Sequence, residues 1–436
     1  MNMSKAKPNT LAGGIICLIL VNIGCADSVL VPSDAQVDTR RPGITGLKKE
    51  RAPKSDAACG TFPSYYFQYL DDTRCQKRLP TNTDRNLFCP NMATSTKVYS
   101  PLQEQTVAYA PAADQPVVDD EALIGVVPED LRITLILVRR VEGKAYYRYL
   151  SNGSHKQTFQ PWSSTKFMAV ANAASNLRKQ SHGSVGLTAV VDGVPLGDFS
   201  SMVHNYDERE YTSNGLARWF LNIGTRSQLS HYIHDQWLGR PTSEKIGGNY
   251  GHPTPDVNLD FVDTYGSVAM MGSDESGWVN RLSTLTIAEF LKRLVMHRED
   301  PDLALPHLKW SDVSTLMYGA EDSVYYDAAT PQGMQGDTAV YLQSGLNMDE
   351  LEKNSKGQWR IFGKLGFGYE RGGEFVHASY GCFPKLDDQG QAIPDVGKEM
   401  IIVTQLNGQG DHHKTDARLA SIYSTLVQGV MNGTIK

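Results

Sequence analysis

Two residues in the middle of the chain have the types and spacing of a nucleophile and its base. Ser163 and Lys166 stand three positions apart in PWSSTKFMAVANA, between a proline and an apolar run. A serine attacks a carbonyl only after a base takes its proton, and a lysine is such a base when its ammonium is destabilised. At a helix start the two side chains share one face, beside N–H groups that favour an oxyanion. The pair predicts an acyl-enzyme on Ser163, although a capping serine and a solvated lysine are the alternative.

Two further motifs follow the pair, one at the start of an expected helix and one on an expected strand. YTSNGLARWF contains Thr212, Ser213 and Asn214, and GKLGFGYE contains Lys364 and Gly366. Together with the S-x-x-K pair, these motifs resemble the serine β-lactamase and penicillin-binding D,D-peptidase superfamily, and class A β-lactamases most of all. That superfamily carries S-x-x-K, S-D-N and K-T/S-G in this order. The resemblance covers roughly residues 125 to 435.

The resemblance implies catalytic roles for five residues. Ser163 would attack the substrate carbonyl, and Lys166 would be the base or part of its proton network. Thr212, which stands where the family has a serine, and Asn214 would pass protons to the leaving group and bind the substrate amide. Lys364 would supply positive charge near the substrate carboxylate.

The expected substrate-binding set consists of Ser213, Gly366, Phe367 and Arg371. The backbone N–H groups of Ser163 and Phe367 would form an oxyanion hole, in which each donor contributes about 3 kcal/mol. Arg371 lies just after the third motif and is expected to bind a substrate carboxylate. A turn residue beside two glycines is the alternative for Arg371.

Two departures from the family pattern bear on the substrate. Leu365 replaces the threonine or serine of the third motif, and the missing hydroxyl indicates a different substrate. Class A β-lactamases use a glutamate on the loop after the second motif to activate the deacylating water. Glu244 is the candidate on that loop, but its flanking pattern differs. A solvated loop glutamate is the alternative.

Apolar patterns around these motifs predict an α+β fold. Residues 133–141 and 144–150 are expected strands before Ser163, and residues 359–370, 374–383 and 398–407 are expected strands near the C-terminus. The expected helices lie at residues 164–179, 216–223, 226–238, 285–297 and 416–431. These patterns predict an antiparallel sheet built from both ends of the domain, with an inserted helical subdomain. The resemblance implies the β-lactamase/transpeptidase-like form of this fold.

The first residues have the pattern of an export signal. Lys5 and Lys7 precede an apolar segment, residues 11–21, which is short for a membrane span. Cleavage after Ala26 and lipidation of Cys25 both remain open. The expected organisation is a signal peptide (1–26), a disordered tether (27–58), a Cys-rich segment (59–124) and the hydrolase-like domain (125–436). We expect a periplasmic or secreted protein that contacts the membrane only through a lipid on Cys25.

Cysteine usage agrees with export. Four cysteines follow the signal segment, at Cys59, Cys75, Cys89 and Cys382. Four cysteines in an exported protein predict two disulfides, and a zinc site, the alternative, would favour a C-x-x-C pair that is absent here. We expect Cys382 to pair with one of the other three, which would tie the N-terminal segment to the catalytic half of the domain.

Composition and motifs together leave three functions open. The net charge of −6 argues against a nucleic-acid partner. The first expectation is hydrolysis of β-lactams, a small-molecule acyl substrate, by a monomer without metal or cofactor. The alternatives are an esterase, amidase or D,D-peptidase that acts on another acyl substrate, and a non-catalytic binding protein on the same scaffold.

Overall fold

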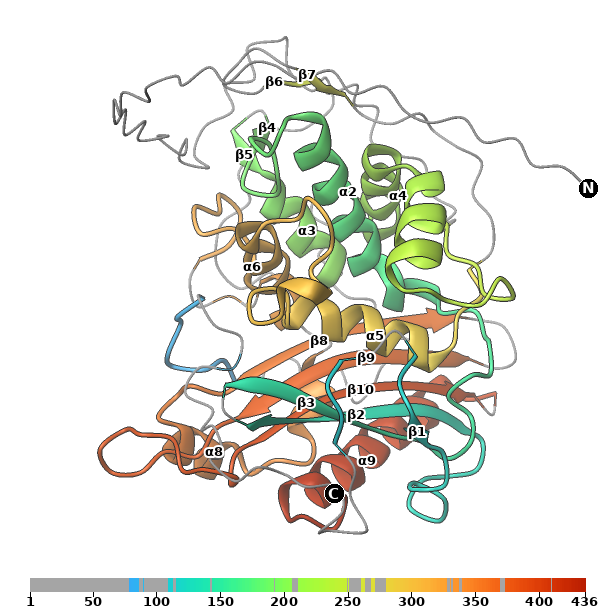
Figure 1. Cartoon of the computed structure of the whole chain (residues 1–436), viewed down its shortest axis with the longest axis vertical. Helices are drawn as coiled ribbons and strands as arrows, with labels where there is room; N and C mark the ends of the chain where they lie inside the picture. The colour runs from blue at the N-terminus through green and yellow to red at the C-terminus, as the bar shows by residue number, and fades with distance from the viewer. Residues whose placement is uncertain are drawn as a thin grey trace, which may run out of the picture. The chain divides into compact units, whose positions relative to one another are not determined.

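A six-stranded sheet forms the centre of the domain (Figure 1). The computed structural model describes residues 78–85, 89, 109–112, 115–141, 143–191, 193–205, 211–248, 250, 260–262, 268–270, 280–327, 330, 332–336, 339–368, 373–408 and 410–436. The strand order is β1-β3-β2-β10-β9-β8. These strands are β1 (Val118–Asp119), β2 (Leu131–Val141), β3 (Lys144–Leu150), β8 (Arg360–Gly368), β9 (Glu374–Phe383) and β10 (Lys398–Asn407). The expected signal peptide and tether, residues 1–58, lie outside the described residues.

Strands from the two ends of the domain meet in the middle of this sheet. β2 pairs antiparallel with β10, and Ile136 lies opposite Ile401. β10 also pairs antiparallel with β9, and β9 with β8, whereas the short β1 is parallel to β3. The predicted α+β fold, with its sheet built from both ends, is therefore confirmed.

Helices cover both faces of the sheet. α5 (Thr284–Val295) packs on β2, β9 and β10 from one side, and α9 (His412–Met431) packs on β9 and β10 from the other (Figure 1). The helical region above α5 contains η2 (Trp162–Thr165), α2 (Lys166–Gln180), α3 (Leu196–Asn205), α4 (Ser213–Gly224), η3 (Gln228–Trp237), η4 (Pro301–Leu303), α6 (Trp310–Tyr318) and η5 (Gly333–Gln335). The remaining elements are α7 (Val340–Gln343), α8 (Met348–Ser355) and the short strand pairs β4 (Val190–Val191) with β5 (Val194–Pro195) and β6 (Asp260–Val262) with β7 (Val268–Met270). None of the helices that the structure describes is long and apolar enough to cross a membrane.

Alternating side chains of the sheet enter two separate cores. The core on the α5 side includes the sheet residues Ile136, Val138, Phe362, Val376 and Ile401. The core on the α9 side includes Leu135, Leu137, Leu365, Phe375 and Ile402. Since neighbouring strand residues point to opposite faces, each of the five longer strands contributes to both cores.

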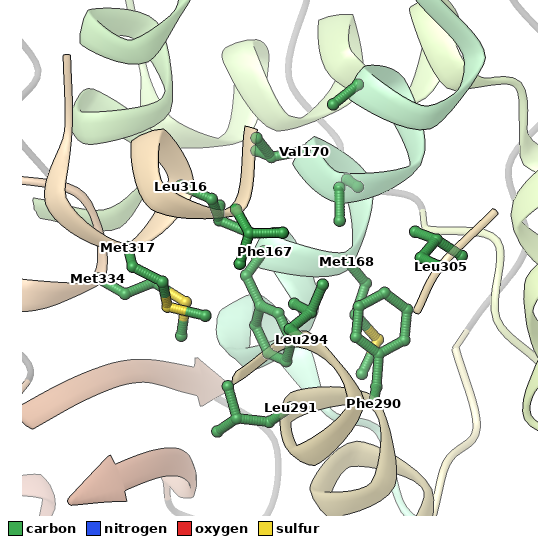
Figure 2. Packing of buried hydrophobic residues seen from close by; sticks show 14 of the residues in the cluster. Phe167, Met168, Val170, Phe290, Leu291, Leu294, Leu305, Leu316, Met317 and Met334 are labelled. Carbon is green, nitrogen blue, oxygen red and sulfur yellow. The ribbon is translucent and has the colours of Figure 1, made fainter. Parts of the chain in front are cut away.

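The start of α2 is fixed by packing against α5. Phe167 and Met168 lie against Phe290 and Leu291 in Figure 2, and the rings of Phe167 and Phe290 meet edge to face with centroids 5.5 Å apart. A buried aromatic pair of this kind contributes about 0.5–1.5 kcal/mol beyond the area it buries. Because these residues directly follow Lys166, the contact also fixes the position of that lysine.

The segment before β1 is tied to the end of the sheet by a disulfide and by hydrogen bonds. Cys89 is bonded to Cys382 in β9, with Cα atoms 5.5 Å apart. Arg360 at the start of β8 donates to the Asp84 carbonyl oxygen at 2.9 Å. The expectation that Cys382 pairs with an N-terminal cysteine is confirmed, and the partner is Cys89. The second expected disulfide would then join the two remaining cysteines, Cys59 and Cys75, which lie outside the described residues.

Removing the disulfide should destabilise the domain strongly. The bond joins residues 293 positions apart, so it restricts the unfolded chain, and its loss should lower the free energy of unfolding by about 2–5 kcal/mol. Chemical denaturation of Cys382→Ala and of Cys89→Ala measures the loss. The double variant should be at least as stable as the less stable of the two single variants, because both substitutions remove the same bond. Additive losses, or a free Cys382 thiol in the oxidised wild type, would contradict the assignment.

Candidate active site

Lys166 is buried at the first position of α2, where neutral side chains hold its amine. Its Nζ donates to Ser213 Oγ at 2.8 Å and to Asn214 Oδ1 at 2.6 Å, and both acceptors lie at the start of α4. The lysine has no exposed surface. Burial disfavours an ammonium, and these two acceptors carry no charge to offset it. The alternative of a solvated lysine is therefore wrong.

Ser163 lies on the 3-10 turn that leads into α2. Its carbonyl oxygen accepts from the Lys166 N–H, so the turn and the helix are continuous. Ser163 is half-buried, whereas Ser164 is fully buried and donates through Oγ to the Pro161 carbonyl oxygen at 2.6 Å. Of the two adjacent serines, Ser163 is thus the one that a substrate can approach.

Strand β8 lies directly against this turn. A Cβ atom placed on Gly366 would lie 2.5 Å from the Pro161 carbonyl oxygen, 2.6 Å from the Ser164 nitrogen and 3.0 Å from the Ser163 nitrogen. Phe367, the other expected oxyanion donor, is the next residue along the strand. The close approach of two backbones therefore brings the Ser163 and Phe367 segments together, and only glycine fits at residue 366.

Gly366→Ala should disrupt this contact. The added methyl meets backbone atoms, which cannot rotate away, so we expect a loss of about 1–3 kcal/mol in stability and at least a tenfold loss in acylation of Ser163. Gly381→Ala in β9 is the matched control, because a Cβ there meets the ring end of Phe383 and the Leu342 side chain. Acylation rates of the folded fractions measure the effect. Equal rates in the two variants would contradict the assigned contact.

Lys364 and Leu365 point to opposite faces of β8. Leu365 is fully buried in the core on the α9 side, and strand alternation places Lys364 on the face of Gly366, towards the Ser163 turn. The leucine therefore fills a core position, and the expectation that it indicates a different substrate is not supported. Lys364 has no exposed surface.

In the second motif, Thr212 caps a helix, whereas Ser213 and Asn214 accept hydrogen bonds from Lys166. Thr212 is the N-cap of α4, and its Oγ1 accepts from the Gly215 N–H at 3.0 Å. Ser213 Oγ accepts from Lys166 and donates to the Val203 carbonyl oxygen at 2.8 Å. Because Ser213 is buried and its hydroxyl contacts both groups, the structure places it in the environment of the lysine instead of on a substrate surface.

His204 lies fully buried at the end of α3, next to Val203. Its Nδ1 is 2.6 Å from the Ser200 carbonyl oxygen, so Nδ1 carries the proton in the neutral ring. Burial, together with the positive charges of Lys364 and Lys166, lowers the pKa of His204 to about 3, against the opposite effect of the Ser200 hydrogen bond. The carbonyl oxygen of Val203, the residue before His204, accepts from Ser213, the partner of Lys166, so His204 lies next to the environment of that lysine.

Stability should depend on pH through His204. The unfolded histidine binds a proton near about pH 6.5, whereas the folded one binds it at about 3. Since the folded pKa is lowered, the contribution of the neutral ring is complete above the unfolded pKa and is lost as pH falls towards 3. Within this window the titration of His204 should lower the free energy of unfolding by about 1.4 kcal/mol for each unit that the pH falls. Denaturation of wild type and His204→Asn across the window tests this, because asparagine does not titrate. Equal slopes would contradict it.

Tyr250 contacts Lys166 from the loop that follows η3. Lys166 Nζ lies 5.5 Å from the centre of the Tyr250 ring, a cation–π distance. The Tyr250 hydroxyl and Thr165 Oγ1 are 3.2 Å apart, and burial raises the pKa of Tyr250 to about 12. Arg226 fixes this loop by donating to the Gly248 carbonyl oxygen at 2.9 Å. Neither Tyr250 nor His204 belongs to a recognisable motif, so the sequence did not indicate them.

Glu244 contacts the start of α5. Its Oε1 accepts from Ser283 Oγ at 2.8 Å and its Oε2 from the Ser283 N–H at 3.3 Å. The side chain is buried, so the expectation of a solvated loop glutamate is wrong. Both carboxylate oxygens are used where α5 begins, and we assign Glu244 a structural role.

The remaining predicted substrate-binding residues are Phe367 and Arg371. The Phe367 ring packs on Phe375 and His412, with centroids 5.1 Å apart in both pairs. Arg371 lies outside the described residues. Within the residues that the structure describes, no group of three or more His, Cys, Asp or Glu side chains is arranged to hold a metal ion.

Several solved structures are similar to the structure of this chain. No family model matches the chain, and no curated protein matches it. An ancestral class A β-lactamase (GNCA) is 14% identical, over 71% of this chain and 99% of its own, with a TM-score of 0.40. A β-lactamase from Xanthomonas campestris pv. campestris is 14% identical, over 71% and 94%, with a TM-score of 0.39. The structure of PBP-A is 13% identical, over 74% and 98%, with a TM-score of 0.41.

The names of these structures are those of the superfamily that the three motifs resemble. Identities of 13–14% and TM-scores of 0.39–0.41 do not carry an activity from one protein to another. Functional assignment therefore rests on the motifs and on the geometry around Ser163 and Lys166.

Proposed function

We propose that the protein is a serine hydrolase that acts through an acyl-enzyme on Ser163. The observation that carries the proposal is the buried amine of Lys166, held by the neutral acceptors Ser213 and Asn214 in the turn after a half-buried serine. A lysine in this environment is suited to take the proton of a nearby hydroxyl. The order of the three sequence motifs supports the same assignment.

The acylation step uses the residues around this pair. Lys166 accepts the Ser163 proton while Oγ bonds to the substrate carbonyl carbon. The N–H groups of Ser163 and Phe367 stabilise the negative oxygen that forms. The proton that Lys166 takes from Ser163 passes to the leaving group through Thr212, whose hydroxyl gives up one hydrogen as it receives another, and the Thr212 oxygen can still cap α4. Water then hydrolyses the ester on Ser163.

A β-lactam is the first substrate class that we propose, on the strength of the motif resemblance. Lys364 points towards the Ser163 turn and would attract the carboxylate that such substrates carry. An ester, an amide or a peptide ending in D-Ala-D-Ala uses the same acyl chemistry and is the second candidate. The protein would act in the periplasm or outside the cell, in keeping with the apolar segment at residues 11–21 and the disulfide.

A panel of three substrates separates these possibilities. Hydrolysis of a chromogenic cephalosporin, a p-nitrophenyl ester and a D-Ala-D-Ala peptide is measured for wild type and Ser163→Ala. Serine-dependent turnover of the cephalosporin supports a β-lactamase, and serine-dependent turnover of either other substrate supports the second candidate. No turnover and no covalent adduct on any of them contradicts the proposal and favours a non-catalytic binding protein.

A further inference from the structure

Trp162, the residue before Ser163, has an unusual backbone conformation. Its φ is +51°, in the left-handed region that bulky residues avoid. Such a conformation costs energy and persists only where the surroundings hold it, often at functional sites. The question is what holds Trp162 in place and what that does for Ser163.

The first restraint on Trp162 is a hydrogen bond to the sheet. Its indole Nε1–H donates to Glu374 Oε2 at 2.8 Å. Glu374 is the first residue of β9, lies opposite Gly368 of β8 and is only 5% exposed. A hydrogen bond to a buried carboxylate is stronger than one between neutral groups. The bond therefore fixes the indole with respect to β8 and β9.

Glu374 is itself held from the neighbouring strand. Gln405 of β10 donates through Nε2 to Glu374 Oε1 at 2.6 Å. Arg132 of β2 donates in turn to Gln405 Oε1. A line of side chains thus runs from β2 through β10 and β9 to the Ser163 turn. Both oxygens of Glu374 accept a hydrogen bond, so the carboxylate cannot move without breaking one of them.

The second restraint on Trp162 is its contact with β8. A Cβ atom placed on Gly368 would lie 1.9 Å from the Trp162 ring, so the indole lies directly on the strand backbone. Gly368 is the residue after Phe367. Trp162 therefore touches the segments of both expected oxyanion donors: it is bonded to Ser163 and packs beside Phe367.

We propose that Trp162 and Glu374 are positioning residues that set the distance between the Ser163 and Phe367 N–H groups before a substrate binds. This inference rests on the proposed function. An oxyanion hole stabilises the transition state only when its donors are already in place, and a displacement of about 1 Å can cost 10²-fold in rate. The expected signature is slower acylation without weaker substrate binding.

Three single variants and one double variant test the contact between Trp162 and Glu374. Trp162→Phe keeps a ring but removes the N–H donor, and Glu374→Leu removes the acceptor. Glu374→Gln keeps a carbonyl oxygen that can accept from Trp162, so it is the matched control. The acylation rate constant of Ser163 and the dissociation constant of the non-covalent complex are measured with a fluorescent penicillin or an activated ester, on protein shown to be folded by circular dichroism.

We expect Trp162→Phe and Glu374→Leu each to slow acylation about 10- to 100-fold, with the dissociation constant changed less than about threefold. The double variant should be no slower than the slower single variant, because both break one bond. Glu374→Gln should stay within about threefold of wild type.

Wild-type acylation by folded Trp162→Phe would overturn the inference and leave the proposed function intact. Absence of any wild-type adduct on Ser163 would overturn both. If Glu374→Leu does not fold, the acylation rates of Trp162→Phe and Glu374→Gln alone test the inference.

Discussion

Ser163→Ala should form no covalent adduct and should lose turnover by about 10⁴-fold or more on any substrate that the wild type hydrolyses. The substitution removes the only atom that can carry the acyl group, while the Lys166 network and the expected oxyanion donors stay in place. Because Ser163 is half-buried, stability should change by less than about 0.5 kcal/mol. Steady-state kinetics and thermal unfolding measure the two effects.

The neighbouring serine provides the matched control. Ser164→Ala removes a buried hydroxyl that donates to the Pro161 carbonyl oxygen, so it should cost about 1–3 kcal/mol of stability. It should nevertheless retain the ability to form an adduct. If Ser164→Ala abolished the adduct and Ser163→Ala did not, the nucleophile would be misassigned.

Lys166→Met should slow acylation by about 10²–10⁴-fold, the usual contribution of a general base. Methionine replaces the stem of the lysine but not its amine, so Ser213 Oγ and Asn214 Oδ1 each lose a buried donor. The free energy of unfolding should therefore also fall by about 1–3 kcal/mol. Acylation rates measured under conditions where the variant remains folded separate the two effects.

Lys166→Arg distinguishes a base from a fixed positive charge. Arginine can donate to Ser213 and Asn214, but it stays protonated at all ordinary pH values and cannot accept the serine proton. We expect it to be more stable than Lys166→Met and similarly slow. Near-wild-type acylation by Lys166→Arg would show that the residue acts only through its charge.

Strong periodic patterns allowed most of the sheet and its main helices to be predicted. Strands β2, β8, β9 and β10 contain apolar runs, β3 is a short tyrosine-rich segment, and α2, α5 and α9 carry apolar stripes. Helix α3 was not predicted, and its composition explains why. LGDFSSMVHN is short, and its Gly, Ser, Asp and Asn residues are typical of loops.

The candidate site was predictable only where its residues lie in local motifs. Ser163 and Lys166 are three residues apart on one turn, and Asn214 begins a helix, so their roles follow from spacing and helix geometry. Trp162 and Glu374 meet across 212 positions, and Tyr250 reaches Lys166 across the loop after η3. Such contacts depend on how the strands and helices pack, which no short pattern contains. For the same reason Thr212 and Ser213, although adjacent, have different contacts.

The position of the covalent adduct tests the account most directly. The purified protein is treated with a fluorescent penicillin or a fluorophosphonate, digested, and analysed by mass spectrometry. The account predicts one labelled peptide with the added mass on Ser163, and labelling of that position in Lys166→Met that is slower by about 10²-fold or more. An adduct on a different residue, or no adduct with either probe on folded wild type, would contradict the assignment of Ser163 as the nucleophile.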